Sequence, residues 1–227
     1  MNVSWHGQSC VKIVTNQQQT ILIDPLISGN PYSDLDAETV AADVIILTHA
    51  HNDHVGDTAA IAHRTGALII ANFELAGYFA KRDYQTHGMQ PGGQFSFYFG
   101  TLKLTPAIHS SSYEDEHGQV HPLGIAAGLI LTIDDKVIYH AGDTALFTDM
   151  TLIGQQHAID LAFLPIGDNF TMGPADAAIA ASWLKAKKVV PVHYNTFPVI
   201  EQDPQDFFKL LPEEQGLPVA IGETIDL

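Results

Sequence analysis

Three histidines and one aspartate crowd into six residues, His49, His51, Asp53 and His54, directly after the apolar run Val44–Leu47. Imidazole nitrogens and carboxylate oxygens are the ligands that zinc and its first-row neighbours take in proteins. Crowded imidazoles lose hydration, and they repel one another once protonated, unless a cation shares their lone pairs. A solvated polar turn rich in histidine is the alternative interpretation. The density of the cluster favours a metal site.

The spacing within this cluster indicates two metal positions. Side chains of an extended segment alternate with a period of two, so His49 and His51 point to the same side. Asp53 and His54 follow as the chain turns, and they therefore point to a neighbouring but distinct place. One ion cannot easily take all four groups, whereas two adjacent ions can.

The pattern H-x-H-x-D-H after a buried strand resembles the signature of the metallo-β-lactamase superfamily. Four residues outside this motif also resemble positions of that family, and they occur in the order that the family requires. Asp24 ends an early apolar run, His109 follows a later one, Asp143 lies in a Gly-Asp turn, and His193 follows a late apolar run. The ordered set is much more specific than an isolated H-x-H would be.

Two further segments, Val3–Ser9 and Ala107–Ser112, resemble one branch of that superfamily. The branch contains small bacterial and archaeal metal-dependent hydrolases related to the ascorbate-6-phosphate lactonases. The resemblance implies an α/β fold, a four-layer αββα sandwich of the metallo-β-lactamase type, formed by a single domain over residues 1–227. It implies a site and a reaction class, but it does not identify a metabolite.

The resemblance also implies how the site is assembled. A first metal would take His49, His51 and His109, a second would take Asp53, His54 and His193, and Asp143 would bridge the two. Two adjacent divalent ions can hold a hydroxide between them, lower its pKa to about 7 and neutralise a developing oxyanion. Asp53 is the expected catalytic residue, because its unbound oxygen can orient that nucleophile or move its proton. Zinc is the first choice of metal, and manganese, nickel, iron or cobalt also suit these ligands.

Asp24 and His6 are candidates for the surroundings of the metals. Asp24 is expected to hydrogen-bond a ligand imidazole, and a turn cap before Pro25 is the alternative. His6 is expected either to line the pocket or to be a satisfied imidazole elsewhere, while His140 is expected to pack within its strand. The segment Ser110–His117 is expected to be a flexible acidic loop at the rim, and its role as a lid stays open. The remaining histidines have no assigned role: His63, His87, His117, His121 and His157.

Composition and charge limit the class of partner. Hydrophobic residues make up 46% and charged residues 16%, which is typical of a globular domain. Ten Lys and Arg stand against 26 Asp and Glu, a formal net charge of −16. Such a surface repels polyanions, so we expect a small-molecule substrate and no nucleic acid. Cys10 is the only cysteine, so thiolates can play little part in the metal site.

Membrane and export signals are missing from the sequence. No apolar run approaches the ~20 residues of a membrane helix, and the first residues lack the basic and apolar regions of a signal peptide. We therefore expect a cytoplasmic protein without a membrane partner. The oligomeric state stays open, a homo-oligomer included.

Alternating apolar runs and helical patterns must position these residues. Strands are expected at Met1–Trp5, Val11–Thr15, Thr20–Ile23, Val44–Leu47, Leu68–Ala71, Gln94–Phe99, Leu102–Ile108, Gly124–Ile133, Lys136–His140, Leu161–Leu164, Val189–Val192 and Val219–Ala220. Helices are expected at Asp57–Arg64, Phe73–Lys81, Pro174–Leu184 and Pro204–Leu211. Each candidate ligand follows an apolar run, where a strand would deliver it to one edge of a sheet.

Three function classes fit these observations. The leading one is a metal-dependent hydrolase that uses a metal-bridging hydroxide on a small ester, lactone or phosphodiester. The second is an iron-dependent oxidoreductase with the same ligand set, but its redox partner domain is absent and Asp143 favours two metals over one. The third is a non-catalytic metal-binding protein, which would not need both metal positions complete.

Overall fold

Two β-sheets form the centre of the molecule, and the computed structural model describes all of residues 1–227. The first sheet contains β1 (Asn2–Trp5), β2 (Val11–Val14), β3 (Thr20–Ile23), β4 (Val44–Ile46), β5 (Leu68–Asn72), β6 (Thr86–Met89) and β15 (Thr224–Asp226). Its strand order is β15-β1-β2-β3-β4-β5-β6, and β3 to β6 run parallel.

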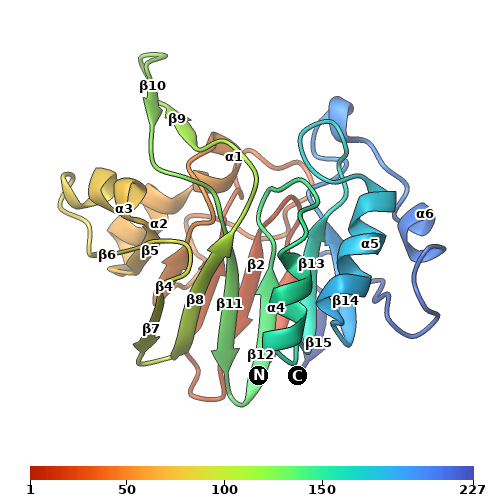
Figure 1. Cartoon of the computed structure of the whole chain (residues 1–227). Coiled ribbons are helices and arrows are strands. Elements are labelled where there is room, and N and C mark those ends of the chain that lie inside the picture. The colour runs from red at the N-terminus through yellow and green to blue at the C-terminus, as the bar shows by residue number, and fades with distance from the viewer.

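The second sheet contains β7 (Gln94–Phe97), β8 (Gly100–Pro106), β11 (Ala127–Ile133), β12 (Lys136–His140), β13 (Leu161–Pro165) and β14 (Lys188–Val192). Its strand order is β14-β13-β12-β11-β8-β7, with β12, β13 and β14 parallel. Two short strands, β9 (Ser112–Glu114) and β10 (Val120–Pro122), form a separate hairpin that projects away from the sheets (Figure 1).

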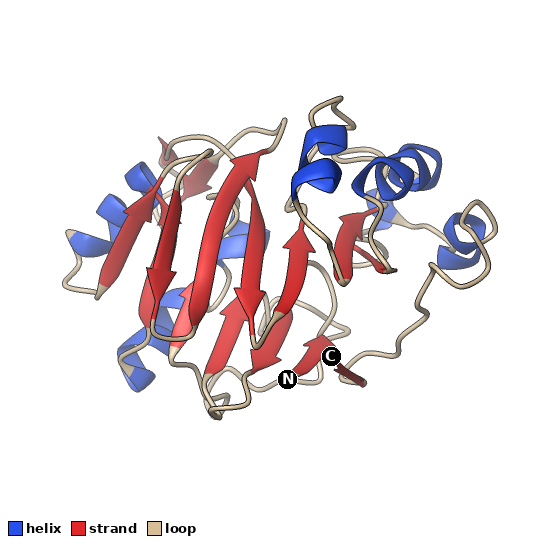
Figure 2. Ribbon diagram, turned by 60° about the horizontal axis from the view of Figure 1, so that its bottom comes forward, coloured by secondary structure: helices blue, strands red, loops and turns tan.

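Helices cover the outer faces of both sheets (Figures 1 and 2). They are α1 (Asn52–Val55), α2 (Thr58–Thr65), α3 (Phe73–Ala80), α4 (Met150–Gln156), α5 (Pro174–Leu184) and α6 (Pro204–Phe208), with a 3₁₀ turn at Pro198–Ile200. The first three belong to the side of the first sheet, and the last three pack on the second sheet. None has the length and apolar character to cross a bilayer.

The alternation of side chains within each strand explains the four layers. In β3, Ile21 and Ile23 enter the core between the sheets, whereas Leu22 faces the core shared with α2 and α3. In β11, Leu129 faces the core between the sheets and Ile130 faces the helices on the other side. Both faces of each sheet are therefore buried, as the continuous apolar runs of these strands require. The expected αββα sandwich is confirmed.

Most expected elements are present with small shifts at their ends, and the clearest error is the strand expected at Val219–Ala220. That segment turns instead: the Glu223 carboxylate accepts the Ala220 N–H, and the Glu223 N–H donates to the Ala220 carbonyl. These backbone groups are thus unavailable to a strand ladder. The last strand is β15, which pairs with β1.

The segment Ser110–His117 also differs from the expected flexible acidic loop, since Ser112–Glu114 forms β9 and pairs with β10. Asp115 closes the turn between them: its carboxylate accepts the backbone N–H groups of His117 and Gln119 and a hydrogen bond from His121. An acidic residue that looks like a solvated loop position in the sequence therefore serves as the acceptor that orders the hairpin.

Candidate metal centre

The ends of β4, β8, β12 and β14 lie at one edge of the sandwich, opposite the two chain termini (Figure 1). His49 and His51 follow β4 and share a side, since Nε2 of His49 lies 2.9 Å from Nδ1 of His51. Asp53 and His54 lie on the single turn of α1, which turns them towards a second place. The sequence pattern predicted this separation, although it did not predict a helix there.

The two parts of the motif meet at one carboxylate oxygen, Asp143 Oδ2. It lies 3.0 Å from Nε2 of His193 and 3.2 Å from Nε2 of His54. It also lies 3.5 Å from Nε2 of His109 and 3.9 Å from Nε2 of His49. Asp143 follows β12, and its carboxylate therefore stands between imidazoles from three segments of the chain: the 49–54 motif, His109 and His193.

The remaining distances divide the donors into two groups. His51 Nδ1 lies 2.9 Å from His49 Nε2 and 3.2 Å from His109 Nε2. Asp53 Oδ2 lies 3.5 Å from His193 Nε2 and 3.6 Å from His54 Nε2. The ligand atoms of His49, His51, His109 and Asp143 lie within 4.8 Å of one another, as do those of Asp53, His54 and His193. All seven expected ligands are brought together, in the grouping that the family resemblance implies.

The chemistry of these donors fits divalent metal ions. Nε2 of His54 and Oδ1 of Asp143 are buried and make no hydrogen bond. Buried polar atoms without partners are costly, and a cation held among them would satisfy both. Seven imidazole and carboxylate donors also exceed what one ion takes in the tetrahedral sites usual for zinc.

Burial and charge divide the imidazoles further. Burial lowers the pKa of His49, His51 and His109, so these rings are neutral at pH 7 and offer lone pairs. Burial also disfavours the charged form of His193, but the Asp143 and Asp53 carboxylates outweigh it and raise the pKa of His193 to about 9. The carboxylates of the centre therefore act most strongly on the imidazoles of the second group.

Asp24 contacts the second group of donors through the ring of His54. Its Oδ2 lies 2.7 Å from Nδ1 of His54, and the same carboxylate accepts the backbone N–H and the hydroxyl of Thr48. Gly56 ends α1 at φ 43° against the Pro25–Leu26 backbone, where a Cβ would overlap the Pro25 carbonyl. This close approach brings His54 to Asp24, which orients the ring as the carboxylate partner of a ligand imidazole does.

His6 lies outside the cavity above these ligands. It is 2% exposed, and its ring nitrogens lie 2.7 Å from Ser4 Oγ and 2.6 Å from Asp34 Oδ1. Both ring nitrogens are thus used away from the donors, as in the alternative of a satisfied imidazole. His140 is fully buried, with its nitrogens bonded to the Ser9 carbonyl and the Gly142 N–H. It packs at the end of its strand, as expected.

Gln8 is a site residue that the sequence did not reveal. Its side-chain amide donates to Asp53 Oδ2 over 2.8 Å. Its backbone carbonyl accepts the N–H of His193 and the indole N–H of Trp5. One residue therefore contacts two expected ligands of the second group. The VSWHGQS segment was the only signal, and it pointed to His6 rather than to Gln8.

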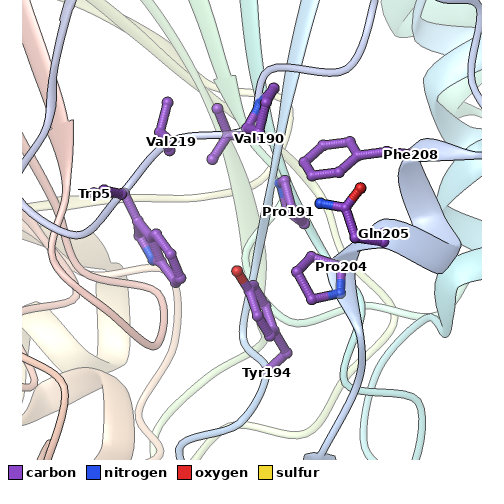
Figure 3. A pocket seen from close by; sticks show the side chains of 10 residues that line it. Trp5, Val190, Pro191, Tyr194, Pro204, Gln205, Phe208 and Val219 are labelled. Atoms are coloured by element: carbon purple, nitrogen blue, oxygen red, sulfur yellow. The ribbon is translucent and has the colours of Figure 1, made fainter.

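A cavity of about 460 Å³ opens above the donors. Five expected ligands line it, together with Asn52, Ser110, Phe170 and Phe197. A separate cavity of about 240 Å³ lies beside β14, with Trp5 on one side and Phe208 of α6 on the other (Figure 3). No expected ligand lines that second cavity, but Tyr194, which follows His193, stacks on Trp5 at 5.4 Å in its wall.

Comparisons with known proteins agree with this geometry. The model of the beta-lactamase superfamily domain matches residues 19–194, a span that contains all seven expected ligands. A protein of Anoxybacillus flavithermus named "UPF0173 metal-dependent hydrolase" is 57% identical over 227 residues, 100% of both chains. The Bacillus subtilis protein named "UPF0173 metal-dependent hydrolase YtkL" is 54% identical over 228 residues, again 100% of both chains.

A solved structure extends the similarity to three dimensions. Igni18, described as a novel metallo hydrolase from the hyperthermophilic archaeon Ignicoccus hospitalis, superimposes with a TM-score of 0.88. The two chains are 34% identical, and the alignment covers 99% of this chain and 97% of the other.

Proposed function

Since the chain belongs to the metallo-β-lactamase superfamily and is one of its metal-dependent hydrolases, we propose that it hydrolyses a small ester, lactone or phosphodiester at a two-metal site. The observation that carries this proposal is the position of Asp143 Oδ2, within 3.0–3.9 Å of imidazole nitrogens from both donor groups. The full-length relatives named as metal-dependent hydrolases favour hydrolysis over an iron-dependent oxidoreductase.

The two groups would hold one ion each. His49, His51 and His109 would bind the first, Asp53, His54 and His193 the second, and Asp143 would bridge them. Zinc is our first choice, and manganese, nickel or iron are compatible with the same donors. Divalent ions at these positions would activate water and neutralise the charge that develops on a carbonyl or phosphoryl oxygen.

The chain's own groups handle the proton. Asp53 Oδ2 faces His54, His193 and the Gln8 amide, whereas Oδ1 accepts no hydrogen bond and the side chain lines the cavity. Oδ1 is thus free to take a proton from the attacking water and to give it to the leaving oxygen. Water adds to the acyl or phosphoryl centre, and the bond to the leaving oxygen breaks. An ester or phosphodiester gives an acid and an alcohol, and a lactone gives one hydroxy acid.

Metal stoichiometry tests the two-metal site. Protein saturated with zinc should bind two ions per chain by elemental analysis, and Asp143→Ala should bind at most one, because the bridging donor is lost. Asp149→Ala is the matched control, since this exposed aspartate starts α4 without a side-chain hydrogen bond. One ion in the wild-type chain, unchanged by Asp143→Ala, would contradict the proposal.

Removing the metal should also lower thermal stability. An ion that binds the folded chain and not the unfolded chain stabilises it by about 2.7 kcal/mol at a hundredfold excess over Kd. A chelator should therefore lower Tm in the wild type and in Asp149→Ala, and the shift should be smaller in Asp143→Ala. Differential scanning calorimetry with and without the chelator measures this shift. Hydrolysis of a panel of chromogenic esters, lactones and phosphodiesters should follow metal content.

A further inference from the structure

The walls of the cavity above the metal centre contain little that could bind a charged group. Apart from the expected ligands, only Asn52, Ser110, Phe170 and Phe197 line it. None of the ten Lys and Arg of the chain does. Lys136 and Lys188 begin β12 and β14, at the strand ends remote from the centre. An anionic substrate group away from the metals would therefore meet no cation.

The two polar side chains of the wall are already used by the protein. The Asn52 amide donates to the Glu114 carbonyl over 2.7 Å, and its oxygen accepts the Glu114 N–H over 3.0 Å. Ser110 Oγ lies 3.2 Å from Nε2 of His51. Both residues thus fix the hairpin and a ligand ring, and neither carries a charge that could pair with an anionic substrate group.

Two phenylalanines supply the remaining surface. Phe170 lies between β13 and α5 and is 55% exposed, and Phe197 lies between His193 and the 3₁₀ turn. An aromatic side chain exposed at the wall of a polar cavity gains free energy when an apolar group covers it. Ligand cavities are mostly apolar, with a few polar groups that fix the reacting atoms, and here the metal centre is that polar part.

We propose that the substrate is an uncharged carboxylic ester or lactone whose aryl or branched alkyl group packs on Phe170 and Phe197. This inference rests on the proposed hydrolase function and narrows it, because it places phosphodiesters and anionic esters outside the preferred class. Water adds to the acyl carbon, the bond from that carbon to the alcohol oxygen breaks, and the proton of water passes to that oxygen. A volume of about 460 Å³ suits a ligand of this size.

Four p-nitrophenyl substrates test the class directly on the metal-loaded wild-type chain. The neutral aryl ester p-nitrophenyl phenylacetate should have the highest kcat/KM. The acetate lacks an apolar group on the acyl side, the hemisuccinate adds a negative charge there, and bis-p-nitrophenyl phosphate replaces the acyl centre, while the leaving group stays the same. A higher kcat/KM for the hemisuccinate or the phosphodiester than for the phenylacetate would overturn the inference while leaving the hydrolase function intact.

Substitution of the two phenylalanines tests the contact. Phe170→Ala and Phe197→Ala should each lower kcat/KM for the phenylacetate about tenfold, mainly through KM, and should change the acetate little. The matched control is Phe73→Ala, because Phe73 is 65% exposed at the start of α3 and does not line the cavity. Equal losses for phenylacetate and acetate would indicate a general structural effect and contradict the proposed packing.

A binding measurement separates this inference from the reaction. An ether analogue, in which CH₂ replaces the carbonyl of the phenylacetate, cannot be hydrolysed. Calorimetry should detect its binding with a negative heat-capacity change, and both Phe→Ala variants should weaken it. If the chain bound two ions but hydrolysed nothing, the proposed function would be wrong. Binding of the ether analogue would still test whether an apolar group packs on the two phenylalanines. No binding of the analogue to the wild-type chain would overturn the inference.

Discussion

Three residues around the centre hold a left-handed backbone conformation that only glycine adopts freely. Gln8 has φ 48°, Asp24 has φ 45° and His193 has φ 53°. Such conformations cost of order 1–3 kcal/mol each and persist only where the surroundings fix them. Here hydrogen bonds do so: the Gln8 carbonyl accepts the His193 N–H, and the Asp24 N–H donates to the Ile46 carbonyl. These three strained positions therefore hold an expected ligand or the immediate partner of one.

Asp53 has the most specific expected role among the ligands. Asp53→Asn keeps the shape and the cavity but removes the basic oxygen, so kcat should fall by roughly two to four orders of magnitude, the scale of general-base loss. Steady-state kinetics with the panel of chromogenic substrates measures the effect. His63→Ala, an exposed position on α2, should change kcat little. Equal losses in the two variants would show that the assignment of Asp53 is wrong.

Gln8 should act through Asp53 rather than on the substrate. Gln8→Met keeps the volume and removes the amide that donates to Asp53 Oδ2, so we expect a loss in kcat of about tenfold with little change in KM. Gln8→Glu should be at least as harmful, because it sets a second carboxylate against the first. Gln17→Met is the control at an exposed glutamine. Wild-type kcat and metal content in Gln8→Met would contradict a positioning role.

The seven residues expected as ligands lie together, and the sequence could predict this because each follows an apolar run or lies in a dense motif. The residues around them could not be found that way. Gln8 meets Asp53 across 45 positions of sequence, and Phe170 and Phe197 come from two separate loops that line the same cavity. Asp24 could be predicted because it ends a strand next to β4, where a hydrogen bond to a neighbouring ligand is the natural use of a carboxylate.

At the scale of elements, the β9–β10 hairpin connects the motif to the rim of the cavity. Asn52, in the first turn of α1, bonds both backbone groups of Glu114 in β9. Ser111 bonds the Leu123 carbonyl and the Ala50 N–H, so the base of the hairpin is tied to the segment between His49 and His51. The hairpin therefore contributes to the position of the first group of ligands.

The helix α4 was not predicted from the sequence, and neither were several elements that depend on distant partners. The helix α1 has four residues, Asn-Asp-His-Val, which are poor helix formers, and tertiary contacts hold it. The strand β6 contains Gly88 and only one buried residue, so it has no alternating apolar pattern. The strands of the hairpin have three residues each and no buried face. Long apolar strands such as β8, β11 and β14 were predicted because their pattern is local.

The hairpin should loosen in acid. Its hydrogen bond with His121, together with the backbone N–H groups of Gln119 and His117, lowers the pKa of Asp115 to about 2, from an ordinary value of about 3.9. A carboxyl group whose pKa is lowered by folding stabilises the hairpin at pH values above its ordinary pKa. This stabilisation is lost as the pH falls to the lowered pKa of about 2. Amide protection in β9 and β10 should therefore decrease between about pH 4 and pH 2, relative to β11.

Hydrogen exchange measured by NMR over this pH range checks the loosening, and Asp115→Asn is the comparison. The amide cannot ionise, so the variant should have weaker protection of β9 and β10 at pH 6 and little further change on acidification. Protection that falls equally in the wild type and the variant would assign the acid effect to other groups.

At the scale of the whole molecule, charge and shape favour the same kind of substrate. The chain has a formal net charge of −16, and its cavity is lined by donors for metal ions and by two aromatic rings rather than by basic residues. Two divalent ions would offset only about four of these charges. Local positive charge is therefore confined to the centre itself. It can act there on one polar bond of a small molecule, but it cannot neutralise successive phosphates along a polyanion.

Long nucleic acids should therefore be poor substrates, because their affinity for proteins depends largely on Lys and Arg that neutralise phosphates. Structured RNA and single-stranded DNA should show no efficient cleavage at physiological salt, under conditions in which a neutral chromogenic ester is hydrolysed. If repulsion by the surface is the cause, replacing Glu114 and Glu116 in the hairpin by Lys should strengthen binding of single-stranded DNA at low salt in a filter-binding assay and leave ester hydrolysis unchanged. Efficient, processive cleavage of RNA by the wild-type chain at physiological salt would show that the charge argument fails and that the cavity takes a polymer.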